Sequence, residues 1–125
     1  MTADPPKIPS DEDFERASAN MAELARLDAA IKDRVLSVFG SVDSFRDFWI
    51  FSAGPRYDAY VFLQRDSDLR QQNAQKLRNQ VIETVLECLE AHGKGPRDAI
   101  SLRVELDSHE RVQREFNGDY YKRFR

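Results

Sequence analysis

The chain has 125 residues, of which 41% are hydrophobic and 33% charged, and this composition fits one ordinary globular domain with a single core. Its 19 Lys and Arg against 22 Asp and Glu give a net charge of -3, the opposite of the basic footprint of proteins that grip duplex nucleic acid or an anionic membrane. One cysteine and two histidines exclude an internal disulfide and a Cys/His zinc cage.

The first nine residues carry three prolines and only scattered apolar side chains, so residues 1–9 are predicted to be a disordered leader. No apolar run approaches the roughly 18 residues of a membrane span. The acidic start also lacks the basic and apolar regions of a signal peptide. We therefore expect a cytoplasmic protein that does not bind membranes.

A long helix is predicted to follow Ser10, because Ser10 and Asp13 have the spacing of an N-cap and acidic residues occupy the first turn. Apolar residues recur at three- and four-residue steps as far as Val38, and Gly40 is expected to end the helix. Asp28 interrupts this stripe. Two alternatives remain: two shorter helices that meet near Asp28, or one helix over residues 11–39. An unbroken helix would be about 43 Å long, so it would overhang the domain or pack against a second copy.

Three strands and two more helices are predicted after this segment. Aromatic and β-branched residues at Phe45–Ala53 and Tyr57–Gln64 flank a Gly-Pro turn, which indicates a hairpin, and Ile100–Asp107 alternates as a half-buried strand does. A long amphipathic helix is expected between the second and third strands, ending at Gly93. A short helix is expected to end at Phe116, with Asn117 and Gly118 as its C-cap.

The element order is therefore α-β-β-α-β-α, which predicts an α+β fold. We expect a two-layer α/β sandwich: a small three-stranded mixed sheet with both long helices on one face. Residues 10–125 form a single domain in this interpretation, with an aromatic and basic tail at residues 117–125.

No residue set indicates catalysis, a metal site or a cofactor site. The glycines around Lys94 follow a helix instead of opening one, so they favour a C-cap over a phosphate loop. Asp66 and Asp68 are typical of helix capping, and Cys88 lies on an apolar helix face. Neither His92 nor His109 has an evident catalytic companion in the sequence. An enzyme whose site is assembled from distant residues stays open as an alternative.

The open face of the sheet is the best candidate for an interaction surface. If Val61 faces the helices, then Tyr60 and Phe62 face outward, and we expect Phe48 and Ile50 to do the same on the neighbouring strand. Four aromatic residues follow the last strand, so the tail either folds back and completes a core there or leaves the patch open as an interface. The candidate binding surface comprises Arg46, Phe48, Tyr60, Phe62, Arg103, Tyr120, Tyr121, Lys122, Arg123 and Phe124.

These features favour a small non-enzymatic protein-binding or regulatory domain, such as an antitoxin-like inhibitor, whose partner is another protein or a second copy of the chain. Self-association would use helix 11–39 or the sheet face. The alternative is an RNA-associated accessory domain that stacks bases on the Arg and aromatic face. Charge makes nucleic acid the weaker hypothesis, because only residues 93–125 carry a positive sum, which is +2.

Overall fold

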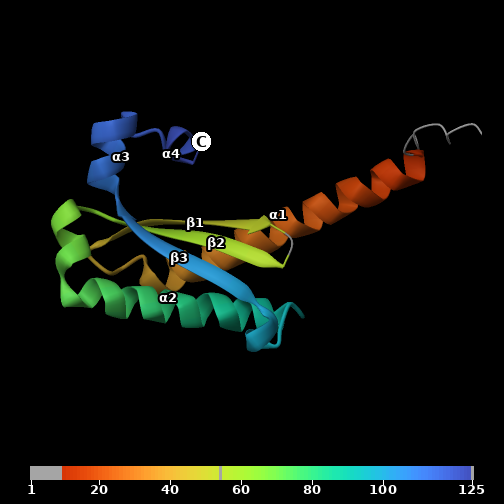
Figure 1. Cartoon of the computed structure of the whole chain (residues 1–125), viewed down its shortest axis with the longest axis horizontal. Coiled ribbons are helices and arrows are strands. Elements are labelled where there is room, and N and C mark those ends of the chain that lie inside the picture. The colour runs from red at the N-terminus through yellow and green to blue at the C-terminus, as the bar shows by residue number, and fades with distance from the viewer. Residues whose placement is uncertain (1–9, 54, 125) are drawn as a thin grey trace, which may run out of the picture.

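The computed structural model describes residues 10–53 and 55–124, so the predicted leader at residues 1–9 lies outside the described part (Figure 1). Its elements confirm the predicted order and the α+β class. They are α1 (Asp11–Phe39), β1 (Phe45–Ala53), β2 (Arg56–Leu63), the 3-10 helix η1 (Asp66–Arg70), α2 (Gln72–Ala91), the 3-10 helix η2 (Arg97–Ala99), β3 (Ser101–Ser108), α3 (His109–Phe116) and α4 (Tyr120–Arg123).

The three strands form one mixed sheet in the order β1-β2-β3. β1 and β2 pair antiparallel as the predicted hairpin, and β2 and β3 pair parallel. A parallel pair requires a long crossover connection, and α2 lies within that connection here. The described helices include none that is both long and apolar enough to cross a bilayer.

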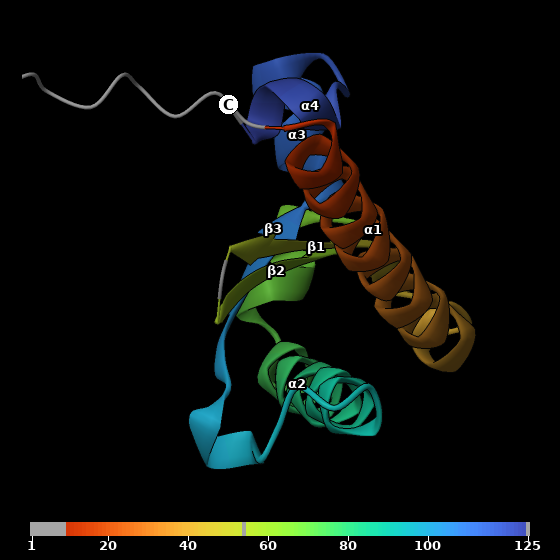
Figure 2. The ribbon, with the colours of Figure 1, turned by 90° about the vertical axis from the view of Figure 1, so that its right-hand side faces the viewer.

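Both long helices pack on the same face of this sheet. Ile31 and Val35 of α1, Val81 and Val85 of α2, and Val61 of β2 all have no exposed surface and belong to one core cluster. Figure 2 shows α1 and α2 flanking the strands, while α3 and α4 lie at the other end of the molecule, away from α2. The second half of α1 is therefore held in place by packing against the face of the sheet that α1 and α2 share, which we call the inner face.

α1 is one unbroken helix that passes through Asp28. The hydroxyl of Ser52 on β1 donates a hydrogen bond of 2.6 Å to Asp28 Oδ1. The carboxylate that interrupts the apolar stripe therefore has a hydrogen-bond partner on the sheet. Burial raises the pKa of Asp28 above its ordinary value, and the Ser52 hydrogen bond opposes that rise. Of the two alternatives, the single helix is the one found, and its first half projects past the end of the sheet (Figure 1).

The predicted orientation of β1 is wrong. Phe48 is completely buried and Ile50 nearly so, both in the core formed with the long helices, whereas Trp49 and Phe51 point to the outer face. The β1–β2 register shifts between Phe45 and Asp47, which indicates a bulge. A bulge inserts one residue and so reverses the face of every residue that follows.

Local signals set most helix ends. Ser10 and Asp13 form the reciprocal N-cap bonds, with Ser10 Oγ accepting from Asp13 N at 3.1 Å. Asn117 adopts the left-handed conformation expected of a C-cap, with φ of 53°. Gly40 follows the last residue of α1, but its backbone has right-handed helical angles. This C-cap therefore does not need the left-handed conformation that glycine allows.

Candidate interaction surfaces

The outer face of the sheet is covered by the C-terminal segment. The ring of Phe124 lies 4.9 Å from Tyr60, 5.0 Å from Phe51 and 5.6 Å from Trp49, measured between centroids. Tyr120 meets Phe62 edge-on at 4.8 Å. Such pairs favour the packed arrangement beyond simple area burial. The tail therefore folds back and builds a second, aromatic core on this face.

An ion-pair cluster holds the tail against β3. Arg123 Nε donates to Asp107 Oδ2 at 2.7 Å, and Arg111 donates to the same oxygen at 2.8 Å. Asp107 is only 4% exposed, so its carboxylate needs these partners. The guanidinium of Arg123 is thus engaged within the protein, and only 15% of its side chain is exposed.

A second polar contact links the tail to α3. His109 Nδ1 and the Tyr120 hydroxyl are 2.6 Å apart, and the Gln113 amide donates to His109 Nε2 at 3.0 Å. Burial lowers the pKa of His109 below its ordinary value, and the positive charge of Arg46 lowers it further, against the opposing charge of Asp47. The neutral imidazole therefore donates from Nδ1 to Tyr120, whose own pKa is raised by burial.

The predicted surface residues do not form one exposed patch. Phe48 and Phe62 are completely buried, on the inner and outer faces respectively. A second group is half-buried under or within the tail, namely Tyr60, Tyr120, Arg123 and Phe124. The exposed members are Arg46 on β1, Arg103 on β3, and Tyr121 and Lys122 on α4. Two aromatic side chains of this face stay exposed, namely Phe51 at 40% and Tyr121 at 74%.

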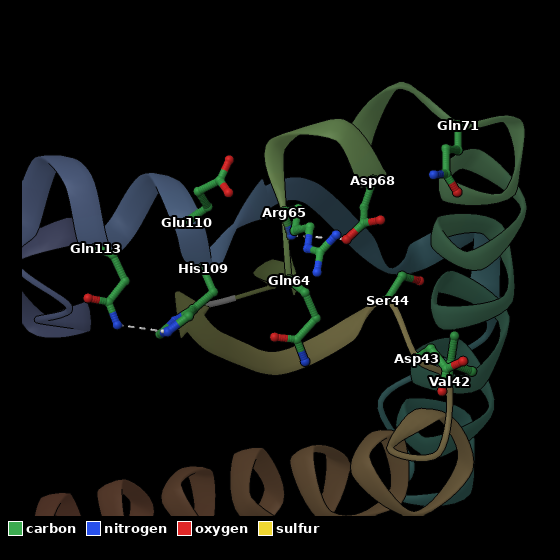
Figure 3. Close-up of a pocket in the computed structure, with 10 residues that line it drawn as sticks. All are labelled: Val42, Asp43, Ser44, Gln64, Arg65, Asp68, Gln71, His109, Glu110 and Gln113. Atoms are coloured by element: carbon green, nitrogen blue, oxygen red, sulfur yellow. Dashed lines mark hydrogen bonds between the residues drawn. The ribbon is translucent and has the colours of Figure 1, made fainter.

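An open cleft of about 890 Å³ lies beside this face (Figure 3). Its residues come from the loop after α1, from the end of β2 with η1, and from the start of α3. Gln64 donates to the carbonyl of Phe45, Asp68 accepts from the Arg65 N–H, and the His109 imidazole is held as described above. Each of these three side chains thus holds local structure at the cleft.

The carboxylates of Asp66 and Asp68 accept hydrogen bonds from groups within the protein. Asp66 accepts from the Ser108 hydroxyl and from Arg114, and these bonds lower the pKa of Asp66 below its ordinary value. Over residues 10–53 and 55–124, no group of three or more His, Cys, Asp or Glu side chains could hold a metal ion. The thiol of Cys88 is half-buried, and burial raises its pKa.

Exposed apolar side chains also lie on the free half of α1, which we define as residues 11–26. Every residue in this range is exposed except the half-buried Asp13, and the first buried residue of the helix is Leu27. Phe14 is 60% exposed, Met21 70% and Leu24 38%. With Ala17 these residues form the apolar stripe, which covers a sector of about 80° at 100° per residue. The same sector contains the buried Val35 and Phe39, whereas the buried Ile31 lies about 20° and Leu27 about 60° outside it.

A hollow of about 340 Å³ opens where the free half leaves the body of the protein. We call it the root pocket; its lining residues are Glu23, Leu24, Arg26, Leu27, Ala30, His92 and Lys94. Its α1 lining mixes apolar and charged side chains, and the remaining two residues follow the C-terminal end of α2. Nδ1 of His92 lies 2.7 Å from the carbonyl oxygen of Cys88, so the imidazole is hydrogen-bonded to the last turn of α2.

Comparison of the chain with protein-family models, with curated proteins and with solved structures finds no match.

Sequence reasoning missed the outer-face residues of β1, and it named the free half of α1 only as part of helix 11–39. Trp49 and Phe51 lie on the outer face in place of Phe48 and Ile50. The bulge between Phe45 and Asp47 causes this difference, and it has no clear sequence signal. The stripe residues of the free half are absent from the candidate binding surface. The signal for them was present, because an unbroken helix of 29 residues is longer than a compact domain of this size can cover.

Proposed function

We propose that this chain is a cytoplasmic, non-enzymatic protein-binding domain whose binding element is the free half of α1. The observation that carries this proposal is the apolar stripe, with Phe14, Met21 and Leu24 exposed on a helix that leaves the body. Burying side chains of this size contributes about 1.5–3 kcal/mol each. A protein surface that covers the stripe would therefore gain substantial free energy.

The length of the free half supports the same conclusion. An isolated helix of this length is marginal in water, and the Ser10 cap and the Glu12–Arg16 pair add only modest stabilisation. A protein partner would supply the packing that normally stabilises an amphipathic helix. A regulatory or inhibitory domain, including one of antitoxin type, would act by presenting such a helix to its target.

The RNA-associated alternative has less support. The rings that would stack bases are largely packed against Phe124 and Tyr120, and Arg123 is paired with Asp107. Single-strand binders need exposed rings beside a positive groove. An exposed arginine such as Arg103 does not by itself provide that combination.

Photo-crosslinking tests the proposal. A benzophenone amino acid in place of Met21, in the full chain produced in its native cells, should give ultraviolet-dependent covalent adducts with protein. The same amino acid in place of Ala19 is the matched control, because Ala19 is exposed on the opposite side of the same helix. Absence of any adduct at Met21, or adducts that nuclease removes, would contradict a protein-binding function.

A further inference from the structure

We infer that the free half of α1 docks in an apolar groove of a different protein, and that basic residues form the rim of this groove beside the first turns of α1. This inference rests on the proposed function and adds the chemistry of the partner. Three observations carry it: the width of the apolar face around the stripe, the sign of the charges that flank this face, and the charged lining of this chain's own clefts.

The apolar face is wider than the stripe alone. At 100° per residue, the small residues Ser18, Ala22 and Ala25 follow Phe14 within about 80° on one side of the stripe. All three are exposed. With the stripe they form a face about 160° wide, in which Asp11 is the one charged residue of the free half. A seam that packs against a single helix is narrower, so this width fits a groove whose floor and two walls all contact the helix.

The stripe also has the spacing of a helix that binds in a groove. Ala17, Met21 and Leu24 follow Phe14 at three, seven and ten residues, so all four project from one side of the helix. Anchors at such intervals are typical of an amphipathic helix that docks in an apolar groove. The free half stands clear of the sheet, so nothing in the fold prevents a groove from closing around it (Figure 1).

The charges that flank this face are acidic. We measure angles around the helix from Phe14, which lies at the middle of the face. Asp11 then lies at about 60°, while Asp13 and Glu15 lie at about 100° on opposite sides. A groove that covers Phe14 therefore brings its rim close to three carboxylates. Basic residues on that rim would complement them and favour this partner over others.

The two basic residues of the free half lie further from the face. Arg26 lies at about 120° from Phe14 and Arg16 at about 160°. Arg16 also lies 3.9 Å from Glu12, which occupies the same back side of the helix. The carboxylates beside the apolar face are thus not offset by a basic side chain of the free half.

Two clefts of this chain lack the basic rim that such a helix needs. Three lining residues of the cleft of about 890 Å³ are carboxylates and one is a guanidinium, namely Asp43, Asp68, Glu110 and Arg65. A hollow of about 680 Å³ between α1 and α2 is lined by one lysine and one glutamate, Lys76 and Glu83. An acidic helix from a second copy would gain no net attraction at either place. The charges therefore favour a different protein as the partner.

Crosslinking from the edge of the apolar face is the first test. A benzophenone amino acid replaces Ser18, which lies between Phe14 and Asp11 around the helix and leaves both in place. The full chain is produced in its native cells and exposed to ultraviolet light, and mass spectrometry identifies the adduct and its crosslinked peptide. We expect a protein other than this chain, crosslinked within a segment that has more Lys and Arg than Asp and Glu.

Charge reversal in the first turn tests the rim. The protein found in the adduct is purified, and its Kd for the full chain is measured. Asp11→Lys should raise Kd by at least about tenfold at low salt, and by less at high salt, because salt screens exposed charges. Glu12→Lys is the matched control, since it makes the same charge change in the same turn on the back of the helix. It should raise Kd by less than about threefold.

A charge within the stripe tests the groove itself. Met21→Glu should raise Kd by at least about 100-fold, because the carboxylate would be buried in an apolar site. Ala19→Glu adds the same charge on the opposite side of the helix and should change Kd by less than about threefold. Both positions are exposed in the free chain, so circular dichroism of both variants should match the wild type.

Three results would overturn the inference and leave the proposed function standing: an adduct between two copies of this chain, a crosslinked segment that is acidic, or equal effects of Asp11→Lys and Glu12→Lys. In each case the free half still binds protein, but not a basic groove. Absence of a protein adduct from both Ser18 and Met21, or a Kd that Met21→Glu does not change, would remove the inference and the proposed function together.

Discussion

His109 shows how a single residue ties the tail to the rest of the molecule. Its imidazole is held between the Tyr120 hydroxyl and the Gln113 amide, with Arg46 and Asp47 as the nearby charges. Protonation would remove the acceptor that Nε2 offers to Gln113 and would add a positive charge close to Arg46. The folded protein therefore favours the neutral ring.

This arrangement predicts a pH dependence of stability. Because the folded-state pKa of His109 is lowered, the unfolded chain binds the proton first as the pH falls through the ordinary imidazole value near 6.5. The contribution of His109 to the free energy of unfolding should be complete above that value and decline below it. Urea denaturation at about pH 7.5 and about pH 5.5 should show a smaller loss in His109→Gln than in the wild type. Equal losses in both proteins would contradict this assignment.

The element α4 is short, and its contacts explain its position. Asp119 caps its start by accepting from the N–H groups of Tyr121 and Lys122. Tyr120, Arg123 and Phe124 then reach the sheet on one side of this single turn. Four residues cannot form a stable helix alone, so tertiary contacts supply its stability.

Removing the Phe124 ring should therefore loosen the outer face. We expect Phe124→Ala to lower the free energy of unfolding by about 2 kcal/mol, below the range for fully buried rings because Phe124 is half-buried. Trp49, the single tryptophan, should become more accessible, with red-shifted emission and stronger quenching by acrylamide. Phe14→Ala makes the same chemical change away from the sheet, and its emission should match the wild type. Unchanged Trp49 emission in Phe124→Ala would mean that the tail does not cover this face in solution.

At the scale of the whole molecule, the body and the free half have separate roles. Burial along α1 begins at Leu27, so the core is complete without residues 11–22. Under the proposed function, the free half stabilises the protein through a partner, because a partner that binds only the folded state raises the free energy of unfolding.

A chain that begins at Glu23 should separate these roles. We expect it to fold with the same sheet and core, and to unfold in urea at the same midpoint as the purified full chain, because the buried residues of α1 begin at Leu27. An unfolded truncated chain would show that the free half stabilises the body directly.

The sequence by itself determined the elements whose signals are local. The Ser10 and Asp13 cap, the alternation of β3 and the left-handed end at Asn117 each depend on residues a few positions apart, so they could be read before any contact was known. The order of elements then followed, and with it the mixed sheet and the common face of the long helices.

The tertiary structure decided what depends on distant partners. β1 carries large apolar residues on both faces, so its sequence pattern does not distinguish whether Phe48 or Trp49 faces the helices. The bulge between Phe45 and Asp47 determines that Phe48 does. Asp28 looked like a helix break until Ser52, 24 positions away, supplied its partner. The tail covers the outer face because Phe124 and Arg123 find Tyr60 and Asp107 there. Each outcome depends on a contact between segments far apart in the chain, and periodicity along one segment carries no information about the other.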